Sequence, residues 1–456
     1  MERENSMRWW HPRHNLLATR RGRLTAFFLL YVTEGIPNGF ALVAMVTQMR
    51  RLGVSPADIG LFSSAFVLPW AFKWAMGPVV DLFHVDRWGR RRGWIVVAQA
   101  LMCVTLMALM AVDLKTQIQA LTALVLLHNV FAATQDVAID ALACGTLQEH
   151  ERGTANGLMF AGAYAGQAIG GAGVLFLLDL GMPLASTIFV VSGAILLVTL
   201  TVSLRLQEPS HAGVVARAGR TRAQALAEAV RTYVTDALRA FFGRRAAVVG
   251  LFVALLPLGP YALSLALCNN LAVELGMSDG LIAKLTLAGT ILAALFCYAG
   301  GRLADRIGRR KTLSLAAVGL ALTTVALAWG LQRQGWLFPV AMDAAAKPVA
   351  SAFLLRLYMA TGLIYSVFQG LMYGARSALF MDVCNPAVAA TQFTAYMALL
   401  NVVISYSTYW QCRFISTLGY PLTLAIDSCL GLVSLFLLPF MTKHAEQPAS
   451  AEHGQG

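Results

Sequence analysis

The chain contains the same short glycine- and arginine-rich segment twice, each time between two long apolar runs. The second copy, residues 301–311, reads Gly-Arg-Leu-Ala-Asp-Arg-Ile-Gly-Arg-Arg-Lys and has a single acid, Asp305. The first copy has Gly77 and Asp81, followed by a basic cluster that includes Arg90. The glycines (77 and 301) and the acids (81 and 305) are each 224 residues apart. Such a fixed offset predicts a chain built from two similar halves.

Apolar runs make up most of the remaining sequence. Of the 456 residues, 58% are hydrophobic and only 13% charged, whereas a soluble protein carries about 25% charged residues. A membrane-spanning helix needs about 20 apolar residues. The runs therefore predict an all-α polytopic membrane protein with 12 transmembrane helices in two six-helix bundles. The expected spans are 24–46, 58–78, 93–112, 118–141, 154–178, 184–204, 247–269, 280–300, 312–331, 351–376, 389–410 and 419–441.

A hydrophilic stretch separates the sixth expected span from the seventh. Its apolar residues, from Leu226 to Phe241, recur at helical spacing, so we expect an amphipathic helix on the cytoplasmic face. The expected parts of the chain are a cytoplasmic N-terminal segment 1–22, an N-terminal bundle 23–204, a cytoplasmic linker 205–245, a C-terminal bundle 246–442 and a disordered cytoplasmic tail 443–456.

The net charge of +12 reflects membrane orientation and not nucleic-acid binding. Most of the 35 Lys and Arg fall in loops that would face the cytoplasm, and the positive-inside rule then places both termini there. The basic segments lack the interleaved aromatics of a nucleic-acid surface. The seven cysteines are scattered without metal-ligand spacing, so we expect no metal and no cofactor. No motif for covalent catalysis appears, so we expect no enzyme.

The first and seventh expected spans are both interrupted by glycine and proline. Residues 34–38 read Glu-Gly-Ile-Pro-Asn, and residues 257–261 read Pro-Leu-Gly-Pro-Tyr. Matching interruptions in two halves point to a transport site, and we predict that both helices break there. The fifth span has Gly162, Gly166 and Gly170 at a four-residue spacing, which predicts a flat face for close helix packing.

Ionisable residues inside spans are costly and need a reason. Glu34 lies beside the interruption of the first span and could carry a proton, or could make a structural hydrogen bond. Asp136 and Asp140 share one helix face. Asp140 is near the cytoplasmic end, where it could cap the helix or pair with Arg152. These three acids are our candidate proton-coupling residues.

Two intramembrane ion pairs are expected. Lys73 and Asp136 lie at similar depths in the second and fourth spans, although Lys73 could instead snorkel to the headgroups. Arg376 and Asp382 bracket the inner end of the tenth span.

The repeated motif resembles the major facilitator superfamily, whose loop between the second and third helices of each half reads G-x-L-A-D-R-x-G-R-R. The copy at 301–311 matches nearly throughout, whereas the first copy has about four inserted residues after Asp81. The resemblance implies two bundles that open alternately to the two sides of the membrane. It implies gating roles for Gly77, Asp81, Arg90, Gly301, Asp305, Arg309 and Arg310.

Several ordered stretches are similar to AmpG-type permeases, a branch that includes muropeptide, siderophore and acetyl-CoA transporters. Among them are Phe72-Lys73, Gln135-Asp136 with Asp140, and residues 151–153, Glu-Arg-Gly. The similarity implies a proton-driven importer of a bulky polar solute in the bacterial inner membrane. We expect the protein to be a monomer in contact with membrane lipids. The candidate solute-binding residues are Glu34, Asn38, Gln135, Tyr261, Lys284 and Gln369.

Two departures keep the solute open. Muropeptide permeases of this type carry Lys and Asp in the seventh span, where this chain has Leu258 and Tyr261, and they commonly have extra C-terminal helices. A siderophore therefore remains an equal candidate. The rival functions are an exporter of the same fold and a membrane-embedded enzyme or sensor.

Overall fold

The computed structural model describes residues 15–52, 54, 56–83, 89–208, 222–264, 271–339 and 349–441. The expected tail 443–456 and most of the expected segment 1–22 lie outside these residues. The helices before residue 205 are α1 Arg20–Gly39, α2 Val46–Arg51, α3 Pro56–Ala71, α4 Met76–Leu82, α5 Arg92–Ala108, α6 Ile118–Thr146, α7 Arg152–Ala168, α8 Val174–Asp179 and α9 Leu184–Thr201. The later helices are α10 Arg222–Phe242, α11 Arg245–Leu255, α13 Asp279–Ile307, α14 Arg309–Arg333, α15 Ala352–Val383 and α16 Ala389–Val433.

Ten helical stretches of the described chain are long and apolar enough to cross a membrane. α16 contributes to two of them, Pro386–Gln411 and Arg413–Phe440, and Gly419 (φ 75°) interrupts the helical backbone within the second. The remaining two expected spans consist of shorter pieces. The second is α3 and α4, and the seventh begins with α11. The helices thus agree with the predicted count of twelve spans.

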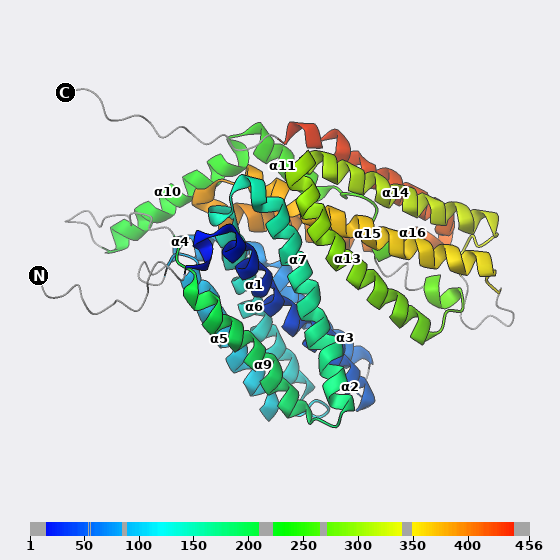
Figure 1. The fold of residues 1–456 in the computed structure, drawn as a ribbon, viewed down its shortest axis with the longest axis horizontal. Helices are drawn as coiled ribbons and strands as arrows, with labels where there is room; N and C mark the ends of the chain where they lie inside the picture. The colour runs from blue at the N-terminus through cyan, green and yellow to red at the C-terminus, as the bar shows by residue number, and fades with distance from the viewer. Residues whose placement is uncertain are drawn as a thin grey trace, which may run out of the picture.

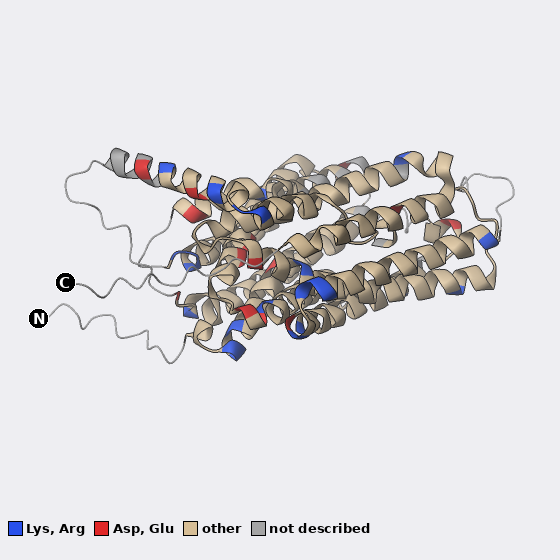
Figure 2. Cartoon of the chain, turned by 90° about the horizontal axis from the view of Figure 1, so that it is seen from above, with Lys and Arg blue, Asp and Glu red and all other residues tan. Residues whose placement is uncertain are grey.

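The helices form two groups that diverge from one shared end (Figure 1). One group holds α1, α3, α5, α6, α7 and α9, and the other holds α11 and α13–α16, with α7 and α13 side by side between them. α10 extends from the shared end. Figure 2 shows that charged residues gather around this end and along α10, and are scattered elsewhere. We call it the joined end.

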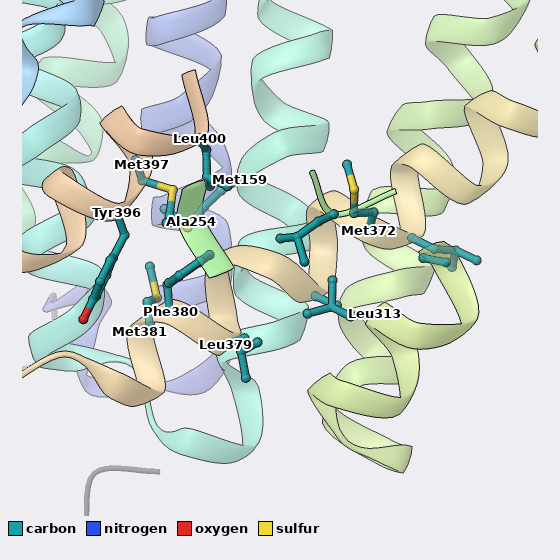
Figure 3. Packing of buried hydrophobic residues seen from close by; sticks show 14 of the residues in the cluster. Met159, Ala254, Leu313, Met372, Leu379, Phe380, Met381, Tyr396, Met397 and Leu400 are labelled. Atoms are coloured by element: carbon teal, nitrogen blue, oxygen red, sulfur yellow. The ribbon is translucent and has the colours of Figure 1, made fainter. Parts of the chain in front are cut away.

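The apolar core also crosses between the groups at the joined end. One cluster of buried side chains combines Met159 of α7 with Phe380 of α15 and Tyr396 of α16 (Figure 3). A second cluster belongs to the first group alone and contains Ile36 near the end of α1, Phe40 just after it, and side chains of neighbouring helices such as Phe62. The two groups therefore share a core at one end only.

The predicted break in the first span is wrong. α1 continues through Pro37, and a π-helical segment, Phe40–Met45, follows it directly. Proline cannot donate a backbone hydrogen bond to the residue four positions earlier. The wider turn that follows keeps the chain helical, and π-helical segments of this kind often lie at functional sites.

The seventh span does break where predicted. α11 ends at Leu255, and Gly259 has a positive φ of 100°. The sequence reasoning missed the residue that makes this break stable inside the protein, Asp427 of α16. Its Oδ2 accepts hydrogen bonds from the backbone N–H groups of Tyr261 and Ala262, both at 2.8 Å. A freed backbone at membrane depth needs partners of this kind.

The glycine face of α7 packs against α1 and not against the second group. A Cβ atom on Gly166 would overlap the carbonyl oxygen of Val32, and one on Gly162 would overlap that of Phe28. The small residues that face α13 are earlier in α7, at Gly153 and Gly157. The flat face that the glycine spacing predicts therefore packs within the first group.

We predict that Gly166→Ile lowers the melting temperature of the purified protein in detergent, because the side chain cannot fit between α1 and α7. Overpacking of this kind costs about 1–3 kcal/mol. Gly193→Ile in α9 is the matched control, since no atom lies within 4 Å of the position of its Cβ. Equal melting temperatures for the two variants would contradict the packing described.

Candidate functional site: a buried acid cluster and an interlocked end

A buried ion pair joins the second and fourth spans. Pro69 lies in the last turn of α3, and a short 3₁₀ turn, Lys73–Ala75, separates α3 from α4. This turn directs Lys73 inward, where its Nζ lies 2.8 Å from Asp136 Oδ2 on α6. Both side chains are buried, so Lys73 does not snorkel. Removing one partner of such a pair typically costs several kcal/mol.

Two further acids lie beside this pair. Asp140, one turn along α6, accepts a hydrogen bond of 2.6 Å from Tyr31 OH of α1 and does not pair with Arg152. Glu34 of α1 lies next to Asp136, and its buried Oε2 has no partner. Glu34, Lys73, Asp136 and Asp140 form what we call the acid cluster, which holds three carboxyl groups and one lysine.

Uncharged polar side chains surround the acid cluster. Gln135 is completely buried and donates to Thr33 Oγ1 at 3.1 Å, as Gln99 does at 3.2 Å. Gln135 therefore packs between α1 and α6 instead of facing a solute. Asn38 is half-buried and accepts from Gln167 Nε2 at 3.3 Å. Among the described residues, no group of three or more His, Cys, Asp or Glu side chains could hold a metal ion.

The remaining candidate solute-binding residues lie in the second group, away from the acid cluster. Tyr261 is buried at the break of the seventh span. Gln369 is half-buried on α15, and Lys284 is exposed near the first turns of α13. The structure therefore does not gather the six candidates into one place.

Each repeated-motif acid binds the first turn of a helix in the opposite group. Asp305, at the end of α13, accepts from Gly153 N at 2.9 Å, Thr154 N at 2.7 Å and Thr154 Oγ1 at 2.6 Å, all at the start of α7. Asp81, at the end of α4, accepts from Thr391 N and Thr391 Oγ1, both at 2.9 Å, at the start of α16. A carboxylate is favourable at a helix N-terminus because it meets unsatisfied N–H groups and the positive dipole end.

Glycines allow the helices to approach at both contacts. A Cβ atom on Gly301 would overlap the carbonyl oxygen of Gly153, and one on Gly77 would come within 2.7 Å of Thr391 Cα. Arg90 adds a hydrogen bond of 3.1 Å to the carbonyl oxygen of Ala387. We call these two contacts, centred on Asp81 and Asp305, the latch.

A second ion-pair network crosses the joined end. Asp382, the penultimate residue of α15, pairs with Arg152 of α7 at 3.0 Å and with Arg309 of α14 at 2.9 Å. The predicted pair between Arg376 and Asp382 is wrong, because Asp382 is bound to these two arginines. Its partners come from other helices, so spacing along α15 could not reveal them.

Arg310 does not contribute to the contact between the groups. It donates to the carbonyl oxygens of Pro439 and Met441, which belong to its own half. Its predicted gating role is therefore wrong. Arg310 instead connects α14 to the end of the last span.

The linker helix also reaches the latch. Tyr233 of α10 hydrogen bonds Thr391 Oγ1, the same hydroxyl that donates to Asp81. Partial burial raises the pKa of Tyr233, so the phenol keeps its proton. Burial and the neighbouring Arg91 lower the pKa of Arg90, which still remains charged at neutral pH because an arginine begins from about 12.5.

These features define a secondary transporter: two helical bundles that are interlocked at one end, with a buried ionisable cluster inside. The sequence profile of the Major Facilitator Superfamily matches residues 25–408. The chain belongs to this superfamily, and it is a transporter and not an enzyme.

Individual relatives indicate which branch of the superfamily the chain resembles. The Rickettsia felis protein described as transporter AmpG 4 is 24% identical over 427 residues, which cover 92% of this chain and 97% of the relative. The anhydromuropeptide permease of Escherichia coli K12 is 26% identical over 389 residues, or 83% of this chain and 72% of the permease. The predicted similarity to AmpG-type permeases is thereby confirmed.

Solved structures support the fold. The proton:xylose symporter XylE matches with a TM-score of 0.65 at 13% identity, covering 93% of this chain and 97% of that one. A bacterial homologue of the iron transporter ferroportin, in an outward-facing state, matches with a TM-score of 0.66 at 12% identity, covering 93% and 98%.

We predict that Asp305→Asn weakens the latch and exposes the joined end. A reporter protein would keep only Cys144 and Cys384, whose buried thiols are in contact across the two groups. Hydrogen bonds to a charged group contribute about 1.5–3 kcal/mol each, so the rate of labelling by N-ethylmaleimide should rise roughly tenfold or more.

Asp113→Asn is the matched control for this measurement. Asp113 lies in the exposed connection before α6 and bonds only locally, to Lys115 and Thr116. An unchanged labelling rate in Asp305→Asn would show that the latch does not hold the two groups together.

Proposed function

We propose that the chain is a proton-coupled importer of an anhydromuropeptide or a similarly bulky polar solute across the bacterial inner membrane. The observation that carries the proposal is the acid cluster, which places three carboxyl groups and one lysine on spans that pack against the joined end. The relatives favour the muropeptide over the siderophore, because one of them is described as an anhydromuropeptide permease.

The cluster has the composition that a proton carrier needs. Lys73 balances one carboxylate, Asp136, at 2.8 Å. Glu34 and Asp136 are neighbouring carboxyl groups, and their mutual repulsion favours a proton on one of the two. Glu34 is less buried than Asp136, and its buried Oε2 has no partner in this state, so we assign the exchangeable proton to Glu34.

The joined end supports a direction of transport, from outside the cell to the cytoplasm. Its loops carry the repeated basic segments, which the positive-inside rule assigns to the cytoplasm. With the latch closed there, the described state would be closed to the cytoplasm and would receive solute from the opposite side. Binding of a proton and of solute would then bias the equilibrium toward the state in which the latch is open.

Concentrative uptake in proteoliposomes tests the proposal. One proton carried down a gradient of one pH unit releases about 1.4 kcal/mol, so a labelled anhydromuropeptide should accumulate up to about tenfold at a stoichiometry of one to one. We expect Glu34→Gln to abolish this accumulation while leaving exchange of labelled for unlabelled solute across the membrane.

The control is Asp179→Asn, which removes a charge at an exposed position at the end of α8. This variant should accumulate solute normally. Uphill uptake by Glu34→Gln, or uptake by the wild type that only equilibrates the solute, would refute the coupling.

A further inference from the structure

Arg376 is a buried cation at the contact between the two helix groups. It lies seven residues before the end of α15, which places it about 10 Å along the helix from that end. The residue is only 6% exposed. The guanidinium lies 4.5 Å from the ring centroid of Tyr373, and Tyr164 of α7 is near enough to interact with it electrostatically.

This arginine has no carboxylate partner among the described residues. Asp382, the acid nearest to it in the sequence on α15, is held by Arg152 and Arg309 at 3.0 and 2.9 Å. The hydrogen bond from Arg376 Nη1 to Tyr261 OH is long, at 3.5 Å, and the buried Nε has no partner at all. The Nη1 donor of the guanidinium therefore makes only a long hydrogen bond, and the Nε donor makes none.

The aromatic contacts alone do not balance the cost of this burial. A cation over an aromatic ring gains less than it loses when the charge is removed from water inside a protein. An anion in contact with the guanidinium would therefore stabilise it more than any partner that the described residues supply.

The acid cluster cannot be that anion in this state, because aromatic rings lie between. Tyr31, which binds Asp140, has its ring centroid 6.3 Å from that of Phe160, and Phe160 lies 5.1 Å from Tyr373. Phe160, Tyr164 and Tyr373 are each half-buried, although they lie where α7 meets α15. A solute would reach the guanidinium past these partly exposed rings.

We propose that Arg376, with the hydroxyl groups of Tyr261 and Tyr164, binds a carboxylate of the transported solute. The guanidinium offers paired N–H donors that match the two oxygens of a carboxylate, and the phenols donate alongside it. The inference rests on the proposed transport function and adds that the solute is an anion recognised by the second half, while the acid cluster of the first half carries the proton.

Two probes test the site separately from the transport function. The first is N-acetylglycine against its neutral carboxamide, measured as thermal stabilisation of the purified full-length protein at tens of millimolar. The second is an anhydromuropeptide against the same molecule with its peptide carboxylates amidated, measured as binding affinity. The variants are Arg376→Gln and Arg376→Lys, with Arg356→Gln, an exposed arginine of the same helix, as the control.

We expect N-acetylglycine, and not its amide, to stabilise the wild type and the Arg356→Gln control. We expect the wild type to prefer the acid form of the anhydromuropeptide by roughly tenfold or more. Arg376→Gln should lose both effects. Arg376→Lys should retain part of each, because lysine keeps the positive charge but lacks the paired N–H donors of the guanidinium.

The outcomes distinguish the two claims. Selective stabilisation by N-acetylglycine without any muropeptide binding would support the anion site and reject the proposed solute. Equal affinity for the acid and amidated muropeptides, with no loss in Arg376→Gln, would overturn the anion site and leave the transport proposal standing. Absence of selective stabilisation by N-acetylglycine would also overturn the site.

Discussion

The capping of helix N-termini across the two groups is the interaction on which this state of the protein depends. Asp305 and Asp81 each accept hydrogen bonds from the first turn of a helix in the opposite group, at 2.6–2.9 Å. The contact is directional, because a carboxylate meets two backbone or hydroxyl donors only at one register of the helices. It also satisfies N–H groups in the first turns of α7 and α16, which would otherwise need partners from their own group. A rigid-body opening can therefore break the latch without unfolding either group.

Away from the joined end, several buried polar groups inside the spans find partners within their own group. Asp427 caps the interrupted seventh span, and Thr33 receives hydrogen bonds from Gln99 and Gln135. Such internal partners let each half keep its shape while it moves. Arg376 is a buried cation with weak partners where the halves meet. In the mechanism that we propose, the acid cluster of one half binds the proton and Arg376 of the other half binds the anion.

The sequence predicted the fold because a membrane forces long apolar runs, and the 224-residue offset revealed the duplication. It also predicted that Lys73 and Asp136 would meet, since charges at matching depth have few alternatives. It failed where partners come from distant segments. Asp382 pairs with Arg152 and Arg309, and spacing along α15 suggested Arg376 instead. Asp427 was missed because a single acid in an apolar run has no local signature, and its role depends on the break 166 residues earlier.

The central claim is that the two groups move as bodies about the latched contact. Electron-spin distance measurements on two labelled pairs test it directly: His150 with Ile307 at the joined end, and Lys115 with Gln334 at the opposite ends of α6 and α14. We expect conditions that open the latch, such as Asp305→Asn, to lengthen the first distance and shorten the second. Changes of the same sign at both pairs, or a change at only one, would contradict the account.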